Sequence, residues 1–92
     1  MNQCLRIVFT SKSKPEEVFD FIQKHAQKYD LEGIVQMVEA NHMRIVVCGH
    51  RDNIENFLDM LHKDAQQRKM EKIEVEPFLK DRDYRGVFRV IE

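Results

Sequence analysis

Apolar and polar residues alternate in four stretches of the chain, at residues 5–9, 34–38, 43–48 and 70–75. This alternation is typical of strands that turn one face toward a core. Residues 39–42 join the two middle stretches as a hairpin turn, in which Asn41 can adopt the positive φ that tight turns require. In the fourth stretch we expect Ile73 and Val75 to point inward. Pro77 cannot donate to a ladder, which predicts that this strand lies at a sheet edge.

Between the first and second strands, apolar residues recur at spacings of three and four, as they do in an amphipathic helix. The helix is predicted to begin at Pro15, where an early helical position tolerates proline, and to end at residue 29 or 30. Ser13 and Glu16 have the spacing of a capping box, which predicts that Ser13 caps the helix.

A second helix is predicted after the third strand, which Gly49 is expected to end. Asp52 or Asn53 is the expected cap, and the apolar stripe continues to about residue 67. Residues 81–83 are then predicted to form a loop, and residues 84–91 a last short strand along a sheet edge.

This order of elements is β-α-β-β-α-β with an extra terminal strand. Right-handed crossovers place the first and third strands in the middle of an antiparallel sheet, with both helices on one face. The sequence therefore predicts an α+β protein with a ferredoxin-like sandwich and a short extra C-terminal strand. Residues 1–92 are expected to form a single domain.

Cys4 and Cys48 are the chain's two cysteines, and they form neither a CxxC pair nor a set with histidines at ligand spacing. We expect the first and third strands to run parallel, which would put these cysteines at opposite ends of the sheet. The prediction is therefore two reduced thiols and no disulfide.

Charge and length limit the partners of the chain. Lys and Arg number 15 against 16 Asp and Glu, so no long-range field would capture nucleic acid or an anionic membrane. An RNA-recognition module has the same order of elements, but residues 43–48 contain no Phe or Tyr on which bases could stack. No apolar run is long enough for a membrane span or a signal segment, so we expect a cytoplasmic location.

No group of residues in the sequence points to a metal, a cofactor or a catalytic residue. The histidines scatter over the predicted fold, and the neighbours His50 with Asp52 and His62 with Asp59 each lack a third ligand. No serine or cysteine has an evident partner base for nucleophilic catalysis.

The best binding candidate is the loop before the first helix, because hydroxyls, ammonium groups and a helix N-terminus can hold an anion together. Its candidate anion-binding residues are Ser11, Lys12, Ser13 and Lys14. Glu16 and Glu17 oppose this reading, since they already satisfy the helix dipole and would repel phosphate. An ordinary helix start is the alternative.

Several segments together resemble the acylphosphatase family, small ferredoxin-like enzymes that hydrolyse carboxyl-phosphate anhydrides. The resemblance rests on the glycine-led strand at Gly33, the strand ending at Gly49, and residues 54–61, 73–75 and 84–90. It covers nearly the whole length and implies the fold predicted above.

The resemblance also implies a glycine-rich phosphate loop, an arginine that opens the first helix, and an asparagine on the second strand that orients water. Phe19 stands in place of the arginine, Met37 in place of the asparagine, and residues 11–16 contain no glycine. Loss of one preorganised stabiliser lowers such rates on the order of a hundred- to a thousandfold. We therefore expect a domain that has lost catalysis and serves as a binding or association module.

The alternative is a divergent acylphosphatase that binds an acyl phosphate or another small anion. The nearest cations that could substitute for the missing arginine are Arg6, Arg44, Lys12 and Lys14. For the association role, the predicted outer face of the sheet carries an apolar stripe of Val8, Val38, Val46 and Cys48, rimmed by charges. Such a stripe can dock a second copy of the chain or a protein partner, or it can simply be a tolerated open face.

Overall fold

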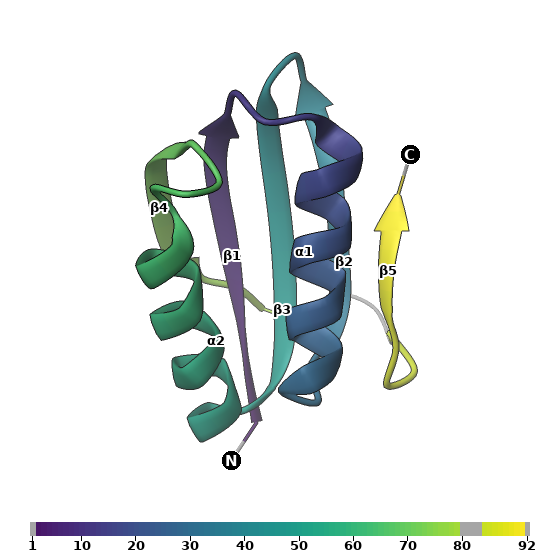
Figure 1. Ribbon diagram of the computed structural model, residues 1–92. Helices are drawn as coiled ribbons and strands as arrows, with labels where there is room; N and C mark the ends of the chain where they lie inside the picture. The colour runs from purple at the N-terminus through teal and green to yellow at the C-terminus, as the bar shows by residue number, and fades with distance from the viewer. Residues whose placement is uncertain (1, 80–83, 92) are drawn as a thin grey trace.

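The computed structural model describes residues 2–79 and 84–91. In chain order the elements are β1 (Asn2–Ser11), α1 (Pro15–Lys28), β2 (Glu32–Glu39), β3 (His42–His50), α2 (Arg51–Asp64), β4 (Met70–Pro77) and β5 (Phe88–Ile91). The strands form one sheet in the order β4-β1-β3-β2-β5, and both helices lie on one face of it (Figure 1). The predicted ferredoxin-like α+β sandwich with an extra C-terminal strand is confirmed.

The orientation of the strands differs from the prediction at two places. β1 runs antiparallel to β3 and to β4, whereas β5 runs parallel to β2, so the sheet is mixed. The expected parallel pairing of β1 and β3 was wrong because the α1 crossover leaves β1 and β2 parallel, and the following hairpin reverses β3.

The antiparallel register places Cys4 directly opposite Cys48, and the two form a disulfide. The prediction of reduced thiols at opposite ends of the sheet was therefore wrong. No free cysteine remains among the described residues.

The core lies between the sheet and the helices, where the inward residues of the strands meet the apolar stripes of α1 and α2. Its fully buried members include Ile7, Phe9, Ile22, Val35, Ile45, Val47, Ile54, Phe57 and Leu61. On β4, Ile73 packs against this core as predicted. Val75 lies opposite the buried Ile7 but stays 40% exposed, because β4 is an edge strand with a neighbour on one side only.

Both helices begin differently from the capping predictions. Lys14 is the N-cap of α1 and makes no side-chain cap, because the Ser13 hydroxyl donates instead to the carbonyl of Arg68. β3 runs directly into α2, so the cap of α2 is His50, whose Nδ1 accepts from the N–H of Asp52 at 3.3 Å.

The described residues directly after β4, 78 and 79, lie on the face of the sheet opposite the helices (Figure 1). Phe78 donates its N–H to the carbonyl of Cys4, and its side chain packs with Tyr84 over Val46 and Cys48. The predicted apolar stripe is therefore half covered by the protein itself, whereas Val38 remains 46% exposed.

The predicted last strand is shorter than expected. The loop predicted at residues 81–83 lies outside the described residues. β5 begins at Phe88 rather than at residue 84, because Arg85 and Gly86 adopt positive φ in a turn closed by the N–H of Val87 on the carbonyl of Tyr84. Neither helix in the described part of the chain has the length and apolar character needed to span a membrane.

Candidate functional site

The loop between β1 and α1 carries the predicted anion-binding residues, and most of its donors are used inside the protein. The hydroxyls of Ser11 and Ser13 both donate to the carbonyl of Arg68, each at 2.9 Å. The backbone N–H groups of Ser11, Lys12 and Ser13 donate to Asn41 O, Lys69 O and the Ser11 hydroxyl.

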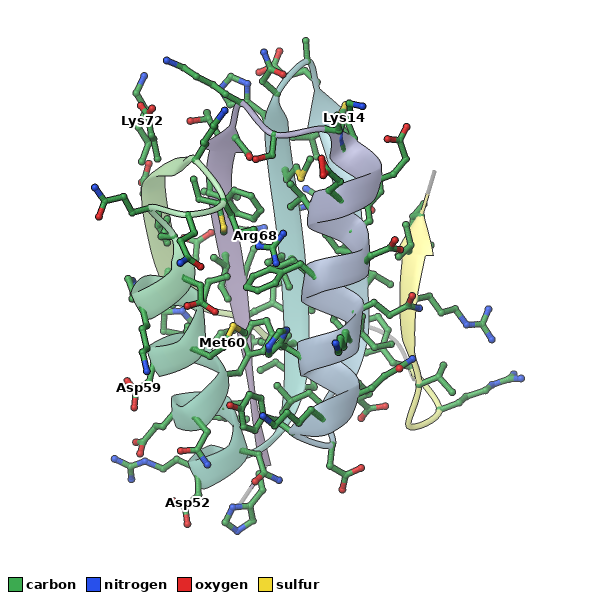
Figure 2. The ribbon with its side chains drawn as sticks, viewed as in Figure 1. Lys14, Asp52, Asp59, Met60, Arg68 and Lys72 are labelled. Atoms are coloured by element: carbon green, nitrogen blue, oxygen red, sulfur yellow. A yellow bond between two sulfur atoms is a disulfide. The ribbon has the colours of Figure 1, made fainter. Side chains whose placement is uncertain are left out.

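These hydrogen bonds tie the loop to the segment that follows α2 and, through Asn41, to the turn between β2 and β3. The ammonium group of Lys12 lies 3.9 Å from Glu71 of β4, and both side chains are well exposed. Lys14 stands at the N-terminus of α1 and points into solvent (Figure 2). Anion binding at this loop stays a prediction, and it would have to rest mainly on the two lysines, because Pro15 has no N–H and the N–H groups of Glu17 and Val18 donate to the carbonyl of Lys14.

The two positions that differ from the family pattern lie in different surroundings. Phe19, in the second turn of α1, is 7% exposed and belongs to the main core. Met37 is 36% exposed near the end of β2. Neither side chain can stabilise a phosphoryl group, since one is an aromatic ring and the other a thioether.

Arg68 is a residue that the sequence analysis missed. It reaches from the segment after α2 toward α1 (Figure 2), where its guanidinium lies 4.4 Å from the centre of the Phe21 ring. Its carbonyl accepts the two serine hydroxyls described above. The carbonyl of Arg68 therefore holds the β1–α1 loop in place. No sequence pattern in the polar link at residues 66–69 predicts this role.

The four cations named as substitutes for the arginine do not lie together. Lys12 and Lys14 belong to the loop, whereas Arg6 and Arg44 line a pocket on the outer face of the sheet, opposite the helices. The outer arginines therefore cannot serve a phosphate bound at the N-terminus of α1.

The histidines make local contacts. Nδ1 of His25 and Nδ1 of His62 each lie 2.9 Å from the carbonyl oxygen four residues earlier in their helices. Within residues 2–79 and 84–91, no three His, Cys, Asp or Glu side chains come close enough together to hold a metal ion.

The model of the Acylphosphatase family matches residues 19–90, and the chain belongs to this family. The match begins at Phe19, so it covers neither β1 nor the loop at residues 11–14. No curated protein matches the sequence significantly.

Solved structures show the same fold. An acylphosphatase from Coxiella burnetii superposes with a TM-score of 0.83 at 23% identity, over 98% of this chain and 93% of that one. An acylphosphatase from Bacillus subtilis gives a TM-score of 0.83 at 18% identity, with complete coverage of both chains. Full-length HypF in its phosphate- and nucleotide-bound form also matches, with a TM-score of 0.76 at 21% identity, but the aligned part is 12% of that longer chain.

Proposed function

We propose that this acylphosphatase-family domain does not hydrolyse acyl phosphates and instead serves as a binding or association module. The observation that carries the proposal is the burial of Phe19, at the position where the family pattern places an arginine. A charged side chain at this position would lose the packing of the aromatic ring and be buried without a partner. The fold therefore disfavours a positive charge here.

The β1–α1 loop supports the same proposal. A phosphate cradle needs backbone N–H groups that point at a common empty position. Here the N–H groups of Ser11, Lys12 and Ser13 are directed to three different acceptors within the protein. Rearranging them around a phosphate would break these hydrogen bonds.

The test is release of inorganic phosphate from acetyl phosphate by the purified chain. We expect a rate within about twofold of the spontaneous rate in buffer, since two stabilisers each worth on the order of a hundredfold or more are missing. A rate far above buffer that Lys14→Ala abolishes would overturn the proposal. Lys24→Ala is the matched control, because Lys24 is an exposed lysine of α1 away from the loop.

Membership of the family favours the alternative, a divergent acylphosphatase acting on carboxyl-phosphate anhydrides. In that case an acyl phosphate or another small anion would bind beside Lys12 and Lys14. The same assay decides between the two functions, because only the alternative predicts turnover that depends on a lysine of the loop.

An association role would use the part of the outer sheet face that the described residues leave exposed. Val38 is 46% exposed there, and Ile91 of β5 is 43% exposed. A dimer or a protein partner held by this face should weaken when Val38→Asp introduces a charge. The measurement is the solution mass at increasing concentration, and a strictly monomeric chain would rule out the dimer.

A cytoplasmic location is also proposed. The Cys4–Cys48 disulfide bears on it, because disulfides persist mainly in oxidising compartments. In a reducing cytoplasm both thiols should react with an alkylating reagent added together with denaturant at cell lysis, because unfolding exposes Cys48, which is 3% exposed in the folded chain. Full protection from the reagent would count against this location.

A further inference from the structure

The outer face of the sheet brings two arginines together on neighbouring strands. In the β1–β3 register Arg6 pairs with Val46, and Arg44 pairs with Val8. Arg6 and Arg44 are therefore diagonal neighbours on one face, within reach of long side chains. Two cations in this position repel each other unless negative charge is supplied nearby.

Only one of the two cations has its charge balanced within the described chain. Arg6 forms an ion pair with Glu76 of β4, and its guanidinium lies 5.7 Å from the centre of the Phe78 ring. Arg44 is half-buried, and its guanidinium has no ion-pair or hydrogen-bond partner among residues 2–79 and 84–91. Arg44 is therefore the member of this pair whose guanidinium no described side chain engages.

Donors and apolar surface surround this unbalanced charge. Gln36 lies directly opposite Arg44 on β2, and its amide offers two further donors. The side chains form a pocket of about 180 Å³, lined by Arg6, Ile34, Gln36, Arg44, Val46, Phe78 and Tyr84. Val46 is 4% exposed and Tyr84 is 8% exposed, so the walls are packed side chains rather than loose surface groups.

We propose that this pocket binds a small monocarboxylate. A guanidinium takes a carboxylate through two parallel hydrogen bonds, and Arg44 is the guanidinium of this pocket that lacks such a partner among the described residues. The volume is below the range of roughly 300 to 1,000 Å³ typical of drug-sized ligands, which limits the ligand to a small molecule. Ile34, Val46 and Phe78 favour an acid with a short apolar body over a free mineral anion.

This site is separate from the β1–α1 loop, which lies at the N-terminus of a helix on the other face of the sheet. The inference rests on the proposed binding role, for which it names a ligand class. The pocket does not depend on the absence of hydrolysis. Turnover of acetyl phosphate would overturn the proposed function and leave this site standing, whereas failure of the titration below would remove the site alone.

The test is a titration of the full chain with sodium benzoate at constant ionic strength, followed by the backbone amide signals in ¹H–¹⁵N NMR spectra. We expect saturable shifts centred on Gln36, Arg44 and Val46, with a dissociation constant on the order of 1 mM for so small a ligand. Shifts centred on Lys14, or none that saturate, would overturn the proposal. This mapping on the unaltered protein does not depend on any variant folding.

Two variants test the role of the charge. Arg44→Gln should weaken benzoate binding by about tenfold or more, as expected for loss of a charge-assisted pair of hydrogen bonds. Lys24→Gln is the matched control, because it removes one positive charge from an exposed position of α1, on the other face of the sheet, and should change the affinity less than twofold. Equal effects of the two substitutions would mean that benzoate responds only to the net charge of the protein, and this result would overturn the site.

Inorganic phosphate is the second arm of the titration. Phosphate should bind more weakly than benzoate, since it gains nothing from the apolar wall and its larger charge costs more to remove from water. Tighter binding of phosphate at the same amides, with the same dependence on Arg44, would overturn the assignment to a carboxylate.

Discussion

Cys4 of β1 and Cys48 of β3 face each other directly across an antiparallel ladder, with their Cα atoms 4.1 Å apart and their sulfur atoms joined. The bond links residues that are 44 positions apart in the chain, so it closes a loop that contains α1 and β2. Cys48 is 3% exposed beneath Phe78 and Tyr84, which makes the disulfide part of the small outer core.

Reduction of this disulfide should lower the free energy of unfolding by about 4 kcal/mol, because the closed loop restricts the unfolded chain. The measurement is urea unfolding with and without dithiothreitol. The double variant Cys4→Ala with Cys48→Ala should unfold near the reduced protein and show no response to the reductant. Identical midpoints for the oxidised and reduced chains, with both thiols shown to be free in the second, would contradict this.

The sequence contained part of the information needed for this disulfide. A helical crossover followed by a tight hairpin makes β1 and β3 antiparallel, so the orientation follows from the order of elements alone. The register of the two strands does not follow from this order. Alternation in residues 5–9 and 43–48 specifies which side chains point inward, but not which residue of one strand pairs with which residue of the other. The ladder of β2 and β3 also shifts between Met37 and Glu39, an irregularity that the sequence pattern does not mark.

Phe19 and Met37 should differ sharply in their effect on stability. Phe19→Ala should destabilise the fold by about 3 to 5 kcal/mol, the usual range for a large aromatic residue removed from a core. Met37→Ala should change stability by less than about 1 kcal/mol, because its side chain is 36% exposed. Chemical denaturation of both variants measures the difference. Comparable losses would mean that the Phe19 side chain does not stabilise the core.

Phe19 and Met37 also show which part of the candidate site could be predicted from the sequence. Counting from Gly33 identified both positions as departures from the family pattern, because the glycine-led strand fixes the alignment. The hydrogen bonds of Ser11 and Ser13 could not be foreseen, since their shared acceptor belongs to Arg68, more than fifty residues away in a polar link. The spacing of Ser13 and Glu16 predicted a capping box instead, and this capping box does not form.

Gly33 should be the least replaceable glycine in the chain. Its φ is +143°, and a Cβ atom there would lie 1.8 Å from the carbonyl oxygen of Val46, in the backbone of the adjacent strand. Gly33→Ala should therefore cost more than about 4 kcal/mol or prevent folding. Gly86→Ala is the control, because Gly86 has φ +71° with open space around it and should cost only about 1 to 2 kcal/mol. Urea midpoints compare the two, and a Gly33→Ala variant as stable as Gly86→Ala would contradict the close approach of β2 and β3.

Val46 and Val38 both belong to the outer face of the sheet, but only one of them is available to a partner. Val46 is 4% exposed under the protein's own Phe78 and Tyr84, so Val46→Asp would bury an unpaired carboxylate and should destabilise the fold by at least about 3 kcal/mol. Val38→Asp changes a residue that is 46% exposed and should cost less than about 1 kcal/mol.

Solution mass and urea unfolding must therefore be measured on both variants. If the chain associates through this face, Val38→Asp should lower the mass while the unfolding midpoint stays close to that of the unaltered protein. Val46→Asp should lower the midpoint whether or not the chain associates. A loss of mass confined to Val46→Asp would reflect unfolding of the domain, and the association surface would then have to lie on another face.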